Sequence, residues 1–182
     1  MPDRNRTRVS RRLIIATAQA IAEKQGVDAV TMRRVAEWLR ITPMALYRHI
    51  ADKEDLLRAL LDRSHADMPP PGPHVDPRVR LLALVRWHHA SLARHPWAIP
   101  LAATGELFPQ VGVCSLYNFD RAFRESGLDH REAAQSLRVL WRFLIGDLTQ
   151  RARRPRAVDR AQESFEEDLG RIIDALLRRP GR

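Results

Sequence analysis

The sequence contains little cysteine and no long apolar run. Cys114 is the one cysteine among 182 residues, so no disulfide can form within the chain, and a lone thiol is most often a small buried hydrophobe. No apolar run approaches the roughly 20 residues that a membrane-spanning helix requires. The arginine-rich start, residues 1–12, is not followed by the apolar stretch and cleavage site of a signal peptide. We therefore predict a protein of the reducing cytoplasm.

Sequence patterns of catalytic and metal sites are also missing. There is no glycine-rich phosphate loop, no Gly-x-Ser-x-Gly elbow and no suggestive pair of carboxylates. Ser115 and Cys114 have no obvious base nearby in the sequence. His88 and His89 are adjacent and point roughly 100° apart on a helix, and no carboxylate or cysteine lies at ligand spacing to join them with His95. We predict neither an enzyme nor a bound metal or other cofactor.

Positive charge is the most unusual feature of the composition. The formal net charge is +9 with a pI near 11.1, and only Lys24 and Lys53 are lysines, so almost all of the cations are arginines. Residues 1–60 carry 12 Lys/Arg against 7 Asp/Glu, an excess of five positive charges. Such a balance indicates a polyanionic partner, although an arginine-rich composition also arises from genome bias.

Helical spacing recurs along the whole chain, whereas the alternation and hairpin turns typical of strands do not. We therefore predict an all-α fold of about nine helices. Residues 1–61 would form an N-terminal domain with a basic arm at 1–9, residues 62–75 a proline-rich connection, and residues 76–182 a larger C-terminal domain. The predicted helices span about 10–25, 31–39, 43–49, 53–67, 76–94, 97–104, 111–126, 129–153 and 159–178.

The second and third predicted helices form a motif of two short helices joined by a tight turn. Val35, Ala36 and Leu39 of the first, and Leu46 and Ile50 of the second, fall on the faces that would meet. The remaining residues of the second helix, from Pro43 to His49, then lie on or beside its outer face. A DNA major groove admits one such helix, whose first residues reach base edges.

In this region the sequence resembles the tetracycline-repressor (TetR) family of transcriptional regulators. The resemblance spans residues 10–61 and includes a first helix ending at Gly26, the segment AVTMRRVA at 29–36, and LYRHIADKEDLL at 46–57. Beyond residue 75 it is limited to architecture and to short phrases such as His95-Pro96-Trp97. The family implies a helix-turn-helix DNA-binding domain followed by a C-terminal sensing and dimerisation domain.

The resemblance also implies which residues touch DNA. Arg33 matches a residue that reaches a base or phosphate, and Tyr47 and His49 match phosphate contacts. Lys53 matches a phosphate contact that is helped by the N-terminus of the fourth helix. The predicted DNA-binding residues are Arg33, Thr42, Pro43, Met44, Ala45, Tyr47, Arg48, His49 and Lys53. Arg40 departs from the family, which usually has glycine at this turn position, so we expect a strained or altered turn.

Pairing of two chains is expected, because a symmetric dimer presents two recognition helices to major grooves about 34 Å apart. In the family the last two long helices form the interface, and both carry apolar stripes here. The predicted interface residues are Leu137, Leu140, Leu144, Leu148, Phe165, Leu169, Ile172, Ile173 and Leu176. The alternative is that both stripes belong to the core of a single chain, and we expect some of each.

Aromatic and histidine side chains between residues 76 and 146 are candidates for a ligand pocket. The predicted lining residues are Trp87, His88, Trp97, Phe108, Tyr117 and Trp141. Ligand binding there would displace the fourth helix and change the spacing of the recognition helices. The predicted function is a ligand-responsive repressor that binds a palindromic operator as a homodimer; the alternatives are an activator, a DNA-packaging protein and an enzyme.

Overall fold

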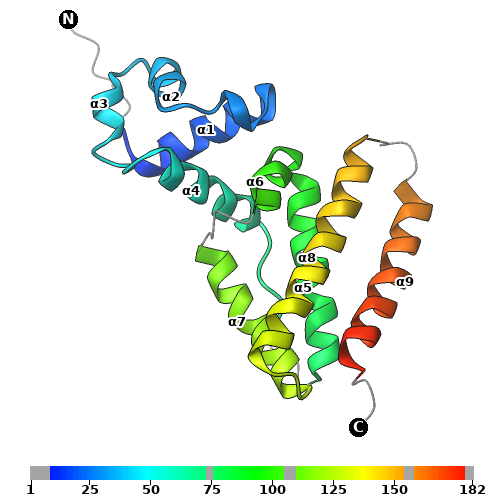
Figure 1. Cartoon of the computed structure of the whole chain (residues 1–182). Coiled ribbons are helices and arrows are strands. Elements are labelled where there is room, and N and C mark those ends of the chain that lie inside the picture. Colours follow the sequence, from blue (N-terminus) through cyan, green and yellow to red (C-terminus); the bar gives the residue numbers. More distant parts are fainter. Residues whose placement is uncertain (1–8, 73–75, 105–109, 154–157, 179–182) are drawn as a thin grey trace, which may run out of the picture.

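The computed structural model describes residues 9–72, 76–104, 110–153 and 158–178 (Figure 1). Within these residues the fold contains nine α-helices and two short 3₁₀ turns but no strand, which confirms the predicted all-α class. The helices form an N-terminal group, α1 to α4, and a C-terminal group, α5 to α9, that lie beside each other in Figure 1.

The N-terminal group consists of α1 (Arg11–Gln25), α2 (Met32–Leu39), α3 (Pro43–Leu46) and α4 (Lys53–His65). Both α2 and α4 pack against α1, and α3 packs against α2. The helix α3 has only four residues, and residues 47–49 continue it as a turn, so it is shorter than predicted. The predicted boundary at residue 61 falls within α4, which continues to His65 and also contacts α5, α6 and α7.

Side-chain caps explain where several of these helices begin. The hydroxyls of Ser10 and Thr31 accept hydrogen bonds from the first turns of α1 and α2, and Asp52 accepts one from Asp55 N–H at 2.7 Å at the start of α4. The residue types also predict that Thr42 caps the third helix, but this is wrong, because its side chain makes no capping hydrogen bond. Instead Pro43 occupies the first helical position, where its missing N–H costs no hydrogen bond.

The C-terminal group consists of α5 (Pro77–Arg94), α6 (Ile99–Thr104), α7 (Gln110–Glu125), α8 (His130–Arg153) and α9 (Val158–Leu177). The single predicted helix over residues 97–104 divides into a 3₁₀ turn and α6. The helix α5 contacts α7, α8 and α9, and α7 and α9 each contact α8. Figure 1 shows α8 and α9 running side by side along one edge of the molecule.

One continuous apolar core connects the two groups. Ile14, Leu46 and Ile50 are fully buried in the N-terminal group, and the core extends through Leu60 and Leu61 of α4 into the C-terminal group. Because α4 contributes to the packing of both groups, it is the element through which a movement in one would reach the other.

Candidate nucleic-acid interface

The helix-turn-helix motif has the packing that its sequence predicts. Val35, Ala36, Leu46 and Ile50 are buried, and Leu39 is partly buried against the same core. The turn between α2 and α3 is fixed by a hydrogen bond from Ile41 N–H to the carbonyl of Ala36, 3.0 Å long. Burial of these side chains leaves the opposite face of α3 free to meet another molecule.

Arg40 adopts the backbone conformation that glycine usually supplies at this turn. Its φ of 54° and ψ of 43° lie in the left-handed region, and it is the one non-glycine residue with positive φ among those described. Its N–H bonds to the carbonyl of Glu37 at 3.1 Å and so ends α2. A non-glycine residue in this conformation is strained by about 1 kcal/mol, which agrees with the expectation of a strained turn.

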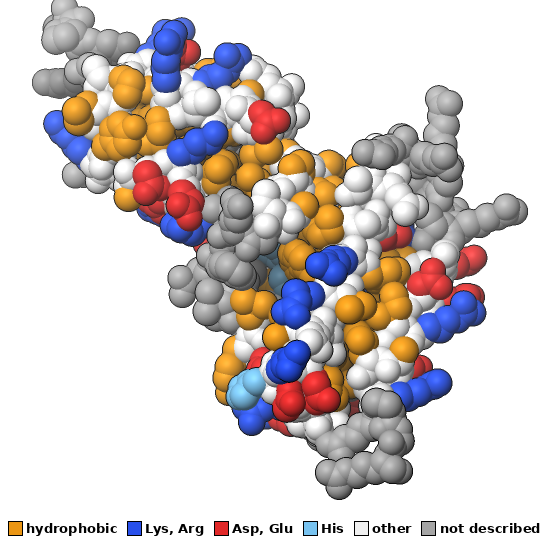
Figure 2. Space-filling view, viewed as in Figure 1, with side chains coloured by type: hydrophobic (Ala, Val, Ile, Leu, Met, Phe, Trp, Pro, Cys, Tyr) orange, Lys and Arg blue, Asp and Glu red, His pale blue; other side chains and the backbone are white. Residues whose placement is uncertain are grey.

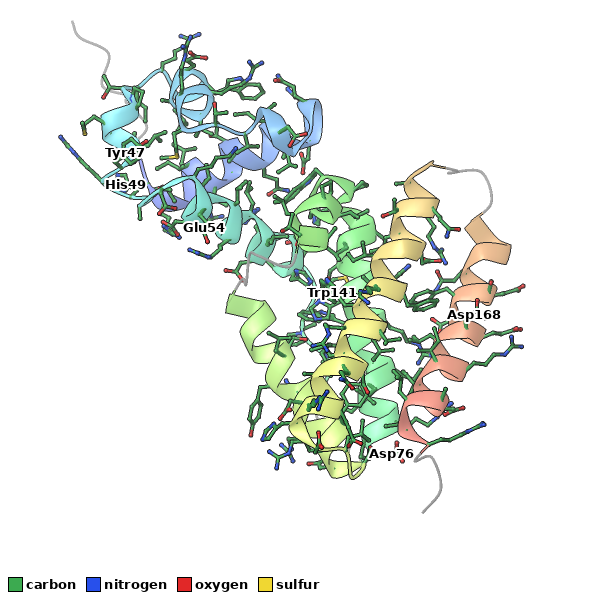
Figure 3. All side chains as sticks on the ribbon, viewed as in Figure 1. Tyr47, His49, Glu54, Asp76, Trp141 and Asp168 are labelled. Carbon is green, nitrogen blue, oxygen red and sulfur yellow. The ribbon has the colours of Figure 1, made fainter. Side chains whose placement is uncertain are left out.

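The outer face of α3 carries exposed residues of mixed chemistry. Met44 is 71% exposed and Tyr47 is 50% exposed, which are high values for large apolar or aromatic side chains. Thr42, Pro43 and Arg48 are also exposed, while Ala45 and His49 are partly buried. Figure 3 shows Tyr47 and His49 at the corner between α3 and α4, on the side of the N-terminal group away from α8 and α9.

Cations border this face on two sides. Lys53 is exposed at the first position of α4, and Arg48 is exposed on the turn before it. Neither forms an ion pair with an acidic group in the described part of the chain. Arg33 lies on α2 and pairs with Glu37 at 2.8 Å, an exposed contact that raises the Arg33 pKa. Such a surface pair contributes little stability, so the guanidinium can exchange Glu37 for a phosphate.

A polar network that the sequence did not predict lies beneath the corner between α3 and α4. The Arg11 guanidinium donates two hydrogen bonds to Asp55, at 2.7 and 2.9 Å, and one to the carbonyl of His49 at 2.9 Å. Asp55 also accepts a bond from Ala51 N–H at 2.9 Å. The Arg11 guanidinium holds the Asp55 pKa at about 2, well below its usual value. Sequence reasoning counted Arg11 only as part of a basic N-terminus.

The predicted pocket residues are only partly brought together. Trp87 and His88 are buried on α5, and the rings of Trp87 and Trp141 lie 4.8 and 5.5 Å from the His88 ring. Trp97 is buried elsewhere, in the 3₁₀ turn before α6, and its indole N–H has no acceptor among the described residues. Tyr117 is 67% exposed on α7, so its side chain is not buried with those of Trp87 and His88. Phe108 lies outside the described residues.

A buried hydrogen-bonded chain joins His88 to α4 and α7. Nε2 of His65, on α4, lies 3.0 Å from Nδ1 of His88, and Nε2 of His88 lies 2.6 Å from the hydroxyl of Ser115 on α7. The hydroxyl of Ser64 lies 3.0 Å from Nδ1 of His65, but it donates its one proton to the carbonyl of Leu61 at 2.7 Å. We therefore assign a proton to Nδ1 of His65, which lies 3.1 Å from the same carbonyl. It follows that His88 donates to His65 and accepts from Ser115. Burial lowers the pKa of both imidazoles, that of His88 to about 3.

Most of the predicted interface residues are core residues of a single chain. Helix-spaced apolar residues on α8 and α9 face α5 and each other, so their side chains are buried within a single chain. Side chains buried in this way cannot contact a second copy. The predicted residues that are core are Leu140, Leu144, Leu148, Phe165, Leu169 and Ile173. Leu137, Ile172 and Leu176 are only partly buried.

Neither a metal centre nor a membrane span is found in the described part of the chain. No group of three or more His, Cys, Asp or Glu side chains is arranged there to hold a metal ion. Among the same residues, no helix combines the length and apolar character needed to span a bilayer.

Comparison with known proteins identifies the N-terminal region. Residues 14–60 match the model of a family described as "Bacterial regulatory proteins, tetR family". "HTH-type transcriptional repressor DrrR1" of Streptomyces coeruleorubidus is 27% identical over 135 residues, which are 73% of this chain and 50% of that protein. The chain thus spans at most about half the length of the curated relatives it matches.

Solved structures show that the fold of most of this chain is similar to that of known proteins. BioQ of Mycobacterium smegmatis has a TM-score of 0.81 at 24% identity, with 93% of this chain and 98% of that chain covered. A BioQ with its natural double-stranded DNA operator has a TM-score of 0.73 at 23% identity, covering 93% and 99%. The TetR family protein ActR of Streptomyces coelicolor, in complex with actinorhodin, has a TM-score of 0.77 at 20% identity, covering 93% and 97%.

The helix-turn-helix packing, the match over residues 14–60 and the likeness of fold agree with one another. Residues 14–60 of this chain are identified as the matching region of the tetR family of bacterial regulatory proteins, and the fold of the described chain is similar to that of solved proteins that include a TetR family protein.

Proposed function

We propose that this protein is a ligand-responsive transcriptional repressor that binds a palindromic operator as a homodimer and is released by a small molecule. The observation that carries the DNA-binding part is the exposed face of α3, with Met44 and Tyr47 outward and Lys53 at the adjoining start of α4. A BioQ of similar fold is known with its operator DNA. The proposal locates the protein in the cytoplasm, and on the nucleoid when an operator is bound.

The proposed contacts divide into two kinds. Residues 42–45 and Arg48 would enter the major groove and read base edges. Arg33, Tyr47, His49 and Lys53 would hold phosphates on either side of the groove. Lys53 has the additional advantage of its place at a helix N-terminus, where unpaired backbone N–H groups favour a phosphate.

The surface proposed for homodimerisation is the boundary between α8 and α9. Figure 2 shows apolar side chains gathered there on the viewed face, and Val139, Phe143, Ile172 and Leu176 are exposed or partly buried along these helices. This set replaces the buried residues that the sequence predicted. TetR proteins pair as dimers, and a two-fold pair would present two α3 helices to successive major grooves.

Charge complementarity supports a second copy as the occupant of this surface. Arg138 and Arg142 are exposed on α8 and have no acidic partner among the described residues. Glu167 and Asp168, on α9, form long ionic contacts of 3.5 and 3.7 Å with Arg171 of the same helix, and Asp168 also accepts a hydrogen bond of 3.4 Å from the Ser164 hydroxyl. When α8 of one copy lies against α9 of the other, each basic pair meets an acidic pair.

The proposed effector site lies around His88, where the rings of Trp87 and Trp141 converge. ActR, whose fold is similar, is known in complex with actinorhodin. A ligand that competed for the hydrogen bonds of His88 would release His65 and with it the C-terminal end of α4. The start of α4 carries Lys53, so such a release would alter the DNA-binding surface.

The two lysines of the chain provide a matched test of DNA binding. A duplex is first selected from a random-sequence pool with the wild-type protein, and binding is then measured by fluorescence anisotropy over a range of salt concentrations. Lys53→Ala should weaken binding and reduce the slope of log K against log [salt] by about 0.9 for each phosphate that the protein no longer neutralises. Lys24→Ala removes the same charge from the end of α1, where the ammonium lies 5.4 Å from the Trp38 ring, and should leave the slope nearly unchanged.

The outcomes separate the competing functions. A packaging protein would enrich no sequence and would protect DNA without a discrete site, which would contradict the proposal. Equal slopes for Lys53→Ala, Lys24→Ala and the wild type would contradict the proposed phosphate contact. A reporter gene behind the selected site distinguishes a repressor, which lowers its expression, from an activator, which raises it.

A further inference from the structure

We propose that Arg11 and Asp55 are positioning residues that set the orientation of the base-reading segment, residues 43–49, relative to the phosphate-binding start of α4. The inference rests on the proposed DNA-binding function. It assigns to Arg11 a task different from the general attraction of DNA that a basic N-terminus would provide.

The geometry of Arg11 is that of a clamp. It is the first residue of α1, and its guanidinium binds both carboxylate oxygens of Asp55, from the first turn of α4. One nitrogen of the same group, Nη1, also donates to the carbonyl of His49 at 2.9 Å. A planar guanidinium fixes the direction of its partners because its donors have a rigid geometry. Three segments of the chain therefore meet at one side chain.

Asp55 holds the other side of the same connection. Its Oδ2 accepts a hydrogen bond from Ala51 N–H at 2.9 Å as well as one from Arg11. The carbonyl of His49 and the N–H of Ala51 are therefore both fastened, on either side of Ile50, whose side chain is fully buried. This leaves the connection from α3 to α4 little freedom to change direction.

The base-reading segment, residues 43–49 (the recognition segment), depends on contacts with other parts of the chain because α3 is short. It has four helical residues, and few hydrogen bonds hold its end, namely those from His49 N–H and Ile50 N–H to the carbonyl of Leu46. Isolated turns of helix are unstable in water. The angle of this segment is consequently set by what its two ends contact, and the Arg11–Asp55 pair is the polar contact at its C-terminal end.

The sign of the charge on Asp55 allows a sharp test. If electrostatic attraction alone mattered, Asp55→Asn would make the protein more positive and would tighten DNA binding. If Asp55 positions the segment, the same change weakens binding to the selected duplex, because Arg11 loses its ionic partner. We expect a loss of roughly three- to ten-fold in affinity for that duplex, and a smaller effect on random duplex DNA.

Arg11→Met and Arg12→Met form a matched pair, since both remove one positive charge from adjacent exposed positions at the start of α1. Arg12 has no hydrogen-bonding partner among the described residues. We expect Arg11→Met to reduce the ratio of specific to random-duplex affinity, and Arg12→Met to leave that ratio unchanged. Arg11→Lys should retain part of the ratio, because an ammonium can bind Asp55 without the two-pronged geometry.

The double variant Arg11→Met/Asp55→Asn completes the experiment. If the two residues act as one unit, the double variant should bind the selected duplex no more weakly than the single variant with the lower affinity. Thermal unfolding of each variant is followed by circular dichroism, and DNA binding is compared at a temperature below the unfolding midpoints of all variants. Circular dichroism at that temperature checks that each variant is folded. Tighter binding by Asp55→Asn, equal ratios for Arg11→Met and Arg12→Met, or additive losses would each overturn the proposal. Failure of the wild type to select any duplex would instead overturn the proposed function itself.

Discussion

Removal of the His88 imidazole should destabilise the protein by an amount that the hydrogen-bonded chain predicts. His88→Leu removes the donor to His65 Nε2 and the acceptor of the Ser115 hydroxyl, both of which are buried. A buried polar group left without a partner costs about 1–3 kcal/mol. Two such groups give an expected loss of about 2–6 kcal/mol in the free energy of unfolding. For a chain of this length the loss corresponds to a midpoint roughly 4–24 °C lower.

A double-mutant cycle separates this cost from loss of packing. His65→Leu leaves the donor at His88 Nδ1 without a partner, so it should also cost about 2 kcal/mol. In the variant His65→Leu/His88→Leu the shared bond is absent from both sides, and the total loss should be smaller than the sum of the single losses by about 1–3 kcal/mol. Urea unfolding followed by far-UV circular dichroism, at one fixed protein concentration, measures all four proteins.

His130→Leu serves as the surface control for this cycle. His130 lies exposed at the start of α8 and pairs with Asp120 at 3.2 Å, so its replacement should change the free energy of unfolding by less than about 0.5 kcal/mol. The reasoning would be refuted if the losses for His65→Leu and His88→Leu were additive within about 0.5 kcal/mol. It would also be refuted if His88→Leu behaved like the surface control.

Three further outcomes follow from the structure. Burial lowers the pKa of His65 and His88 below the ordinary 6.5, so at acid pH the unfolded chain binds more protons than the folded protein. The contribution of the neutral imidazoles to the free energy of unfolding should be fully present above pH 6.5 and should fall at lower pH by up to about 1.4 kcal/mol per pH unit for each imidazole. Urea unfolding at a series of pH values should show a gentler fall for His88→Leu. Arg40→Gly should relieve the positive φ and raise or leave unchanged the unfolding midpoint, whereas Arg40→Val should lower it by a few degrees, both measured by thermal scans. Val139→Glu should shift the sedimentation of the protein from dimer to monomer. Val79→Glu, on the first turn of α5, is the control, because Val79 has the same 44% exposure and its replacement should leave the dimer intact. Equal behaviour of the two variants would contradict the proposed dimer surface.

The parts of the fold that sequence predicted well are those that local chemistry determines. Caps at Ser10, Thr31 and Asp52 fixed the start of three helices, because each side chain bonds to an N–H only three residues ahead. The inward residues of the helix-turn-helix followed from spacing alone. The left-handed turn at Arg40 was also predictable, since the resemblance identified a position that requires positive φ whatever residue occupies it.

The parts that sequence missed depend on partners far apart in the chain. Arg11 and Asp55 are separated by 44 residues, and each is an ordinary surface type at its own position. The apolar stripes of α8 and α9 show a different limit. Helical periodicity identifies a face that is buried but not what buries it, so Leu140 and Leu169 fit a dimer interface and a single-chain core equally well. Only the packing of α5 against both of these helices decides in favour of the core.

The two polar networks at opposite ends of α4 would allow one helix to serve both the proposed DNA binding and its proposed regulation by a ligand. The pair of Arg11 and Asp55 is ionic and two-pronged, so the first turn of α4 should move together with the recognition segment. At the other end His65 is held by individual hydrogen bonds between neutral groups. A ligand with a comparable donor or acceptor can replace these hydrogen bonds at little net cost in free energy. A helix of 13 residues spans roughly 18 Å and is stiff over that length. A small shift at His65 should therefore move Lys53 and the recognition segment as one body.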